Sequence, residues 1–346
     1  MSRILLADIA SHNCGGKSIG HYYSVASNYV NLISCVIAGG PIYLYKFDKE
    51  NIYLLPYDTK TEENVFKKKV KQLLNCHTLF KNTVGDTVIL QHAALATAII
   101  GIVLFKKKHT KLFLITYNDE GNNTIFKRFW YRLAKRKIEG IICPYENIGK
   151  NYDVPFCVVS DYIYSGNDNK IQYCDYEDKS YDFCVVGRLA YEKGVIEVAK
   201  KFVNTNYRVL IAGKPQTQDI ADELFAICNG AKNIILKLEY ISEKEYYNFI
   251  QISRYCILNY KGGYSERSSG VVLDILFNGT PVVGNKCKAL GFIEEYGVGC
   301  LFDDIFSFNF SYLLNRACYK KYLEKINAYK KIQSQCGNKL KEFIEL

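Results

Sequence analysis

The sequence predicts an α/β protein made of two Rossmann-like domains, each with a mostly parallel sheet. Short apolar runs typical of buried strands alternate with helical patterns through both halves of the chain. A polar segment without apolar periodicity, residues 166–180, separates the two halves. The 346 residues are also enough for two domains of ordinary size.

The expected strands are short runs of aliphatic and aromatic residues that end at Gly, Asn or a charged residue. A β-hairpin is expected at residues 42–55, where Tyr43, Tyr45 and Tyr53 alternate around a polar turn. The expected strands are residues 4–10, 34–38, 88–91, 112–116 and 140–143 in the first half, and 183–186, 207–212, 233–236, 255–259 and 281–284 in the second.

These elements give the expected domain boundaries. The first domain covers residues 1–165 and the linker covers residues 166–180. The second domain covers residues 181–320, and a Lys-rich helical tail, residues 321–346, is expected to pack back towards the first domain.

Composition indicates a cytoplasmic globular protein. The chain is 49% hydrophobic and 23% charged, and its first residues lack the pattern of a secretory signal. The longest apolar stretch, residues 88–105, is interrupted near its start and favours a strand followed by a buried helix over a membrane span. The 13 cysteines have no metal-ligand spacing, which favours reduced thiols and no metal site.

The positive charge is concentrated in one region. Residues 60–140 contain 16 Lys/Arg and 6 Asp/Glu, so 16 − 6 = +10, which is the whole formal excess. The basic clusters fit either solvated helix faces or a surface for anionic lipid or a phosphate-bearing acceptor. Within residues 125–138, Phe126, Phe129 and Trp130 recur at helical spacing beside cations, as in a helix that lies on a membrane. No nucleic-acid motif accompanies the charge, so nucleic acid is not an expected partner.

The stretch of residues 257–284 has the pattern of an anion site. A buried strand runs into a glycine turn, Glu266 follows on the loop, and a helix opens at Ser268-Ser269-Gly270. The unpaired N–H groups of a helix N-terminus attract an anion, and a carboxylate such as Asp274 accepts hydrogen bonds from sugar hydroxyls. The pattern predicts a site for a phosphorylated ligand.

Two cations follow an earlier strand in the same half. Arg188 comes directly after Gly187, and Lys193 opens the next helix. Such a pair at the end of a strand can hold a diphosphate, although an ordinary surface turn would also place Arg and Lys there. A further strand ends in a glycine turn at Gly213.

Three segments together resemble the C-terminal domain of retaining glycosyltransferases of family 4, which have the GT-B fold. These are GRLAYEKG (residues 187–194), VLIAGKP (residues 209–215) and the run from Glu266 to Pro281. In the family, two acids lie eight residues apart, as Glu266 and Asp274 do here. This chain has Asp in place of the second Glu, and Arg-Ser-Ser follows the first acid in place of Gly-Phe-Gly. The resemblance implies two Rossmann-like domains that face each other across a cleft.

The resemblance also implies roles for these residues. The donor is a nucleotide-diphosphate sugar, with no further cofactor. Arg188 and Lys193 neutralise the leaving β-phosphate, Glu266 holds hydroxyls of the sugar, and Asp274 binds the ribose. The expected catalytic residues are Glu266, Arg188, Lys193 and His92; the expected donor-binding residues are Gly15, Gly16, Gly187, Arg188, Lys193, Gly213, Ser268, Ser269, Gly270, Val271 and Asp274.

The first half is less specific. In the family, a glycine turn such as Gly15-Gly16 approaches the donor phosphates. His92 follows a predicted strand and fits either a cleft histidine or an ordinary packed or exposed one, with His12 and His21 as weaker candidates. A P-loop is not supported at Gly16-Lys17-Ser18, because Ser11 occupies the position of its first glycine, and the glycine pattern of a dinucleotide site is incomplete.

The sequence therefore predicts a glycosyltransferase that moves a sugar to a glycan or lipid-linked acceptor, with retention and without metal. We expect a cytoplasmic protein, peripheral on the inner face of the plasma membrane, that takes part in bacterial surface polysaccharide or glycoconjugate synthesis. One alternative is a non-catalytic GT-B-like binding partner of a glycosylation complex, and another is a GT-B epimerase or phosphorylase.

Overall fold

The chain divides into two compact units, which are described one at a time. The first unit comprises Met1–Ser165 together with Gln333–Leu346, and the second comprises Gly166–Ile332. The structure is a computed structural model. It describes residues 3–10, 25–26, 29–30, 33–45, 47–59, 62–91, 95–117, 124–159, 175–266 and 269–345.

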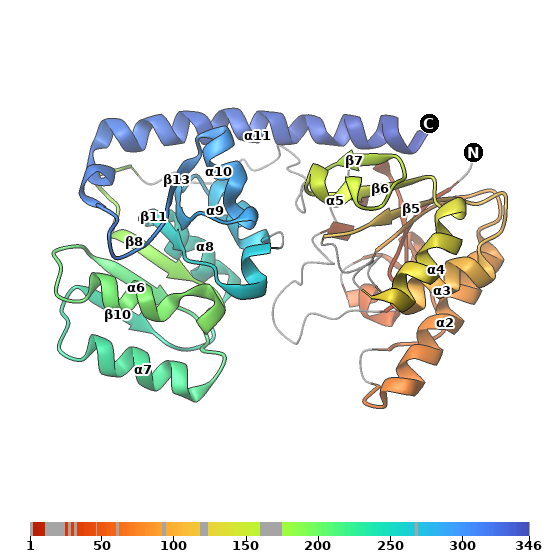
Figure 1. Cartoon of the computed structure of the whole chain (residues 1–346), viewed down its shortest axis with the longest axis horizontal. Helices are drawn as coiled ribbons and strands as arrows, with labels where there is room; N and C mark the ends of the chain where they lie inside the picture. Colours follow the sequence, from red (N-terminus) through yellow and green to blue (C-terminus); the bar gives the residue numbers. More distant parts are fainter. Residues whose placement is uncertain are drawn as a thin grey trace. The chain divides into compact units, whose positions relative to one another are not determined.

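A seven-stranded parallel sheet forms the centre of the first unit (Figure 1), with the order β3-β2-β1-β4-β5-β6-β7. The strand order reverses between β1 and β4, so these neighbours form the topological switch point where ligands of open α/β sheets bind. The strands are β1 (Ile4–Ala7), β2 (Val36–Gly39), β3 (Ile52–Leu54), β4 (Thr87–Leu90), β5 (Lys111–Ile115), β6 (Gly140–Cys143) and β7 (Phe156–Val158).

Both faces of this sheet are buried, which explains why its strands are almost continuously apolar. Leu5 and Ala7 of β1 belong to a core that includes residues of α2, α3 and α4, whereas Leu6 belongs to a second core on the opposite face. α3 contacts both α2 and α4, so the three helices form one layer (Figure 1). The helices are α2 (Val65–Asn82), α3 (Ala96–Phe105), α4 (Ile125–Ala134), which continues into the 3-10 turn η4 (Lys135–Lys137), and α5 (Glu146–Lys150).

The end of the last helix, α11 (Arg316–Glu345), completes the second core of the first unit. Leu340 and Ile344 are buried with Leu6, and the ring of Phe343 lies 5.3 Å from that of Phe113. A Cβ atom at Gly140 would lie 2.4 Å from Cζ of Phe343, so the absence of a side chain in β6 makes room for this ring. Residues distant in sequence thus form one hydrophobic layer.

The hairpin expected at residues 42–55 is wrong. Pro41–Tyr45 forms the 3-10 turn η1, Lys49–Asn51 forms η2, and only Ile52–Leu54 is a strand, which pairs in parallel with β2. Tyr43 is buried, and its hydroxyl donates a hydrogen bond of 2.8 Å to Asp8. The alternating tyrosines were therefore misleading, because Tyr43 is held by a side-chain contact far away in sequence.

The second unit is built on a six-stranded parallel sheet with the order β10-β9-β8-β11-β12-β13. This is the Rossmann order 3-2-1-4-5-6, with its switch point between β8 and β11. The strands are β8 (Tyr181–Val186), β9 (Val209–Ala212), β10 (Ile234–Lys237), β11 (Ser253–Leu258), β12 (Val282–Asn285) and β13 (Gly299–Phe302).

Helices and 3-10 turns connect these strands and cover the sheet. Apolar residues of α6 and α7 join Phe183, Val209 and Tyr255 in the main core of this unit. The helices are α6 (Val195–Phe202), α7 (Gln218–Cys228), α8 (Glu243–Gln251), α9 (Gly270–Phe277), α10 (Gly291–Tyr296) and the first part of α11; the 3-10 turns are η5 (Tyr191–Lys193), η6 (Gly262–Glu266), η7 (Lys288–Leu290) and η8 (Ser311–Leu314).

All ten strands expected from the apolar runs are present, with ends that differ by at most three residues. β7 and β13 were not expected, because runs of three or four residues are too short to give a periodic signal. Among the residues that the structure describes, no helix is long and apolar enough to cross a membrane. The segment after β4 is instead the short buried helix α3, as the sequence predicted.

The described end of the expected linker is packed into the second unit. The guanidinium carbon of Arg254 lies 4.3 Å from the ring centroid of Tyr176, and Lys179 is buried. Residues 175–180 are thus part of the fold that leads into β8. Residues 160–174, which include the rest of the expected linker, lie outside the described ranges.

The position of Leu340 yields a prediction for stability. Replacing a fully buried leucine with alanine leaves a cavity, so Leu340→Ala should lower the free energy of unfolding of the first unit by about 2–5 kcal/mol. Scanning calorimetry would measure this change. Lys341→Ala, at the neighbouring exposed position, should leave the free energy of unfolding almost unchanged. Equal melting temperatures of the two variants would show that the end of α11 is not part of this core.

Candidate functional site

Three turns meet at the carboxyl edge of the second unit's sheet, beside its switch point. They follow β8, β9 and β11, and backbone hydrogen bonds join them. The N–H of Gly187 donates to the carbonyl of Ala212 (3.0 Å), and the N–H of Lys261 donates to the carbonyl of Glu192 (2.8 Å). The segments that sequence analysis identified separately thus form one surface.

Two glycines allow this close approach. Gly213 has a φ of +145°, and a Cβ atom there would lie 1.7 Å from the carbonyl oxygen of Gly187. Gly194 has a φ of +62°, and a Cβ atom there would lie 2.3 Å from the carbonyl oxygen of Asn259. A side chain at either position would both strain the backbone and separate the turns.

The two predicted cations lie on the turn after β8. The Nζ atom of Lys193 lies beside Gly187, 3.9 Å from the point where a Cβ atom would be. Arg188 is exposed and pairs with Glu192 at 3.7 Å. The side chain of Arg188 is 53% exposed, so this surface pair contributes little to stability and leaves the guanidinium accessible to a stronger anion.

Asp274, on α9, is connected to the same turn by Tyr246 of α8. The hydroxyl of Tyr246 donates to Oδ2 of Asp274 (3.3 Å), and its ring lies 3.8 Å from the position of a Cβ atom at Gly187. Burial raises the pKa of Asp274 to about 7, although the hydrogen bond from Tyr246 acts in the opposite direction. Burial also raises the pKa of Tyr246, so its hydroxyl remains a donor at neutral pH.

The N-terminus of α9 supplies backbone donors beside this carboxyl group. The helix begins at Gly270, and Asp274 is one turn further along the same face. The first N–H groups of the helix, those of Gly270 and Val271, have no acceptor within it. Among the residues that the structure describes, no atom of another segment lies within 4 Å of the position that a Cβ atom at Gly270 would take.

The remaining predicted donor residues have different outcomes. The hydroxyl of Ser269 is buried and shares a 2.7 Å hydrogen bond with the hydroxyl of Tyr260, so it neither caps the helix nor lies open to a ligand. Glu266 ends η6, and the position of its side chain lies outside the description, as does Ser268. Tyr246 was not predicted, because an aromatic residue in the first turn of a helix carries no signal of its own.

The arrangement is suited to a ligand with both anionic and hydroxyl groups. Arg188 and Lys193 carry positive charge, and the N-terminus of α9 adds its dipole. Asp274 is an acceptor for hydroxyl donors once it is ionised. A phosphorylated sugar or a nucleotide combines these features, as the sequence pattern had indicated.

The first unit has polar groups at its own switch point. Asp8 follows β1 and is buried; it accepts hydrogen bonds from the N–H of Ala10 (3.0 Å) and from the hydroxyl of Tyr43. Gln91 follows β4, is fully buried, and within the described ranges neither polar atom of its side chain has a hydrogen-bond partner. The candidates His92, Gly15 and Gly16 lie outside the described residues.

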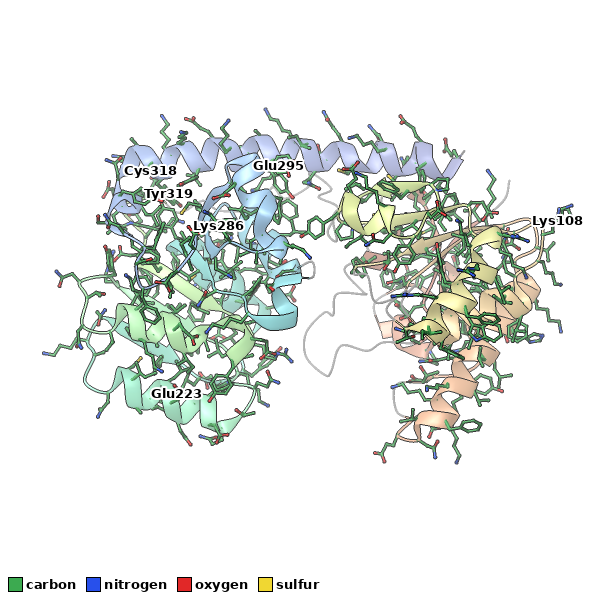
Figure 2. All side chains as sticks on the ribbon, viewed as in Figure 1. Lys108, Glu223, Lys286, Glu295, Cys318 and Tyr319 are labelled. Carbon is green, nitrogen blue, oxygen red and sulfur yellow. The ribbon has the colours of Figure 1, made fainter. Side chains whose placement is uncertain are left out.

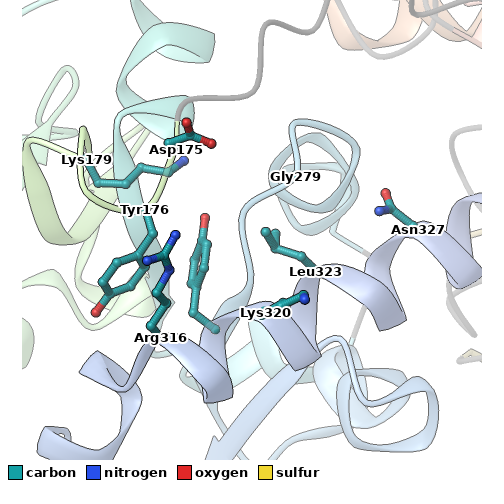
Figure 3. A pocket seen from close by; sticks show the side chains of 9 residues that line it. Asp175, Tyr176, Lys179, Gly279, Arg316, Lys320, Leu323 and Asn327 are labelled. Carbon is teal, nitrogen blue, oxygen red and sulfur yellow. The ribbon is translucent and has the colours of Figure 1, made fainter.

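A separate pocket of about 290 Å³ lies at the amino edge of the second sheet (Figure 3). Its lining comes from residues just before β8, from Gly279 before β12, and from the start of α11. Arg316 in this lining pairs with Glu177 (3.6 Å), and the Nζ atom of Lys179 lies 6.0 Å from the ring centroid of Tyr319. Because it lies at the other end of the strands, this pocket does not belong to the cluster around Gly187.

Comparison with known proteins supports the fold assignment. No protein-family model and no curated protein sequence matches the chain. Trehalose-6-phosphate synthase OtsA is a similar solved structure, with a TM-score of 0.70, 10% identity and 99% of each chain covered. HepE from Anabaena, in complex with UDP and glucose, has a TM-score of 0.65 and 14% identity over 100% of both chains.

The same fold also occurs in a protein named for other chemistry. The N-terminal domain of trehalose-6-phosphate phosphatase from Candida albicans has a TM-score of 0.65 and 9% identity, and the match covers 100% of this chain and 97% of that one. At such low identities the likenesses show the fold, and the predicted GT-B fold class is confirmed. Activity must be argued from the site itself.

The raised pKa of Asp274 gives a prediction for pH dependence. In the unfolded chain this carboxyl group ionises near pH 4, whereas in the folded protein it keeps its proton up to about pH 7. Folding therefore binds a proton in this window, and Asp274 makes the protein less stable as the pH rises from 4 to 7. Asp274→Asn should remove this loss and stabilise the protein by about 2–4 kcal/mol above pH 7, with little change at pH 4.

Thermal unfolding of both proteins across this pH range would measure the effect. Asp219→Asn, at an exposed position of α7, is the matched control. A stability difference between Asp274→Asn and wild type that does not grow with pH would contradict the raised pKa.

Proposed function

We propose that the protein is a glycosyltransferase that uses a nucleotide-diphosphate sugar as donor and transfers its sugar to a glycan or lipid-linked acceptor. The second unit binds the donor, and the first unit binds the acceptor. The observation that carries this proposal is a cluster at the switch point of the second sheet. There Lys193 and Tyr246 lie beside Gly187, and Tyr246 donates a hydrogen bond to Asp274, one turn into α9.

The chemistry of the transfer matches this set of groups. As the bond between the anomeric carbon and the β-phosphate oxygen breaks, negative charge develops on the leaving diphosphate. Arg188, Lys193 and the helix N-terminus stabilise that charge, and so they lower the barrier more than they strengthen ground-state binding. They take the place of a divalent ion in this proposal, and chelation of metal by EDTA should leave turnover unchanged.

Asp274 and Glu266 position the donor. Asp274 accepts hydrogen bonds from the ribose hydroxyls, which favours its ionised form, and Glu266 binds hydroxyls of the transferred sugar. Retention of the anomeric configuration follows the resemblance to family 4. HepE, a protein of similar fold, was solved with UDP and glucose, which makes UDP-sugars the first donors to test.

The acceptor side rests on the first unit. The buried amide of Gln91 marks the switch point of that sheet, and His92 beside it is proposed to act on the acceptor. The basic region of residues 60–140 is proposed to face an anionic membrane. The enzyme would then work in the cytoplasm, at the inner face of the plasma membrane, in bacterial surface polysaccharide or glycoconjugate synthesis.

The alternative is a GT-B-like partner that binds a sugar nucleotide without transferring the sugar. The occurrence of this fold in a domain of a protein named as a phosphatase favours testing it. Two measurements separate the candidates. A panel of UDP-, GDP- and dTDP-sugars should raise the melting temperature if the donor site exists, and mass spectrometry with glycan and lipid-linked acceptors should detect the product. Stabilisation without product would favour the binding partner, whereas no stabilisation by any nucleotide would refute the donor site.

Substitution of the two cations tests their role. Arg188→Ala and Lys193→Ala should each lower kcat about 100-fold or more, because each removes a positive charge that faces the leaving diphosphate. Steady-state kinetics with the donor identified by the panel would measure the loss, and unchanged melting curves would show that both variants fold.

Lys200→Ala is the matched control for this experiment. Lys200 lies on α6, close in sequence to Lys193, but it pairs with Glu223 (3.1 Å). Glu223 lies on α7 (Figure 2). Its removal should leave kcat unchanged. Wild-type turnover in both Arg188→Ala and Lys193→Ala would show that these residues do not bind the diphosphate.

A further inference from the structure

α4 presents large apolar side chains to solvent. Helices on the surface of a protein normally bury their apolar face, and single exposed apolar residues need no explanation. Here four of the ten residues of one helix are large, apolar and exposed. Their exposed fractions are 86% for Ile125, 56% for Phe126, 60% for Phe129 and 46% for Leu133.

These four side chains form one face of α4. This face is different from the face that packs against the rest of the first unit. At about 100° per residue, the four positions fall within an arc of about 100°. Tyr131 and Ala134 point to the opposite side and are buried, and the ring of Tyr131 lies 5.3 Å from that of Tyr152. α4 therefore has two apolar faces, and among the residues that the structure describes only the inner face packs in a core.

Cations border the outer face. Residues 124–138 contain six Lys and Arg and no Asp or Glu. Arg128 and Arg132, one turn apart, project along the edge of the apolar arc next to Ile125. Both also line a hollow of about 330 Å³ with Lys135, which pairs with Asp153 in the same lining.

Other cations of the basic region serve the fold. Lys106 is 5% exposed and pairs with Glu139 (3.2 Å), and the Nζ atom of Lys137 donates to the carbonyl of Val103 (2.7 Å). Lys108, by contrast, points into solvent (Figure 2). The formal charge of the region thus overstates its surface charge, and the arginines beside the apolar face of α4 are the informative ones.

We propose that α4 docks the protein onto a bilayer that contains anionic phospholipid. Ile125, Phe126, Phe129 and Leu133 enter the interface between headgroups and acyl chains. Arg128 and Arg132 bind lipid phosphates at the headgroup level, as in other amphipathic helices that lie in a membrane surface. Charge selects this occupant, because an apolar face bordered by cations matches an anionic bilayer in both respects.

The topology gives this docking a consequence for the acceptor. Each of α2, α3 and α4 connects parallel strands, so each must begin at the carboxyl edge of the first sheet. Two further apolar side chains, Val65 and Phe66, are 66% and 75% exposed at the start of α2. The bilayer therefore lies by the edge that ends in Gln91, where a membrane-embedded acceptor would enter. This step rests on the proposed function of the first unit.

Vesicle sedimentation tests the proposal on the full chain. The protein should bind phosphatidylcholine vesicles that contain phosphatidylglycerol at least about tenfold more strongly than vesicles of phosphatidylcholine alone, and added salt should reduce the difference. Arg128→Gln with Arg132→Gln should lower binding to the anionic vesicles about tenfold. Equal binding of wild type to both kinds of vesicle would overturn the proposal.

Apolar substitutions test the inserted face. Phe126→Ser with Phe129→Ser should lower binding to anionic vesicles at least about tenfold, because two phenyl groups no longer leave water. Phe225→Ser is the matched control, since Phe225 is 57% exposed on α7 beside Asp222 and Glu223. An equal loss with Phe225→Ser, or a stable dimer in solution that Phe126→Ser with Phe129→Ser dissolves, would overturn membrane docking.

The same variants separate this proposal from the donor site. All of them should melt as wild type does and be stabilised equally by the nucleotide sugar, because their substitutions lie in the first unit or on α7. If vesicle binding fails while nucleotides still stabilise the protein, the docking face is wrong and the donor site stands. If the protein binds vesicles but no nucleotide stabilises it, the donor site is wrong and the docking face stands.

Discussion

The contact between the backbones of Gly187 and Gly213 is the constraint on which the second unit's site depends. With a side chain at position 213, the turn after β9 could not lie against the carbonyl of Gly187. The turn after β8, which carries Arg188 and Lys193, would lose its support on that side. The contact of Gly194 with Asn259 fixes the other side in the same way. Two glycines, Gly194 and Gly213, thus fix the turn that carries the positive charges of Arg188 and Lys193.

The fold was predictable wherever burial leaves a periodic or continuous apolar signal. Strands of a parallel sheet covered on both faces are nearly uniformly apolar, so β4, β6 and β9 stand out in the sequence. The segment around Tyr43 was misread because its order comes from a hydrogen bond to Asp8, 35 positions away. β7 and β13 were missed because they are short strands, of three and four residues, at the edges of their sheets.

The site was predictable to the extent that its chemistry lies in local motifs. Gly187, Arg188 and Lys193 share one turn, and Asp274 follows Glu266 at a fixed spacing. What connects them is Tyr246, which is 28 residues from Asp274 and is recruited only when β8 and β11 become neighbours. Spacing also gives no measure of burial, so the protonation of Asp274 near neutral pH could not be foreseen.

The path of α11 affects the order in which the protein can be completed. Most of the first unit precedes the second in the sequence, yet Leu340 and Ile344, which cover one face of its sheet, follow the whole of the second unit. Until they are in place, Leu6, Ile89 and Phe113 lack their partners from α11. The core of the first unit is therefore complete only after the chain has passed through the whole of the second unit. Until α11 docks, the chain exposes part of this apolar layer, and transiently exposed apolar surface favours aggregation.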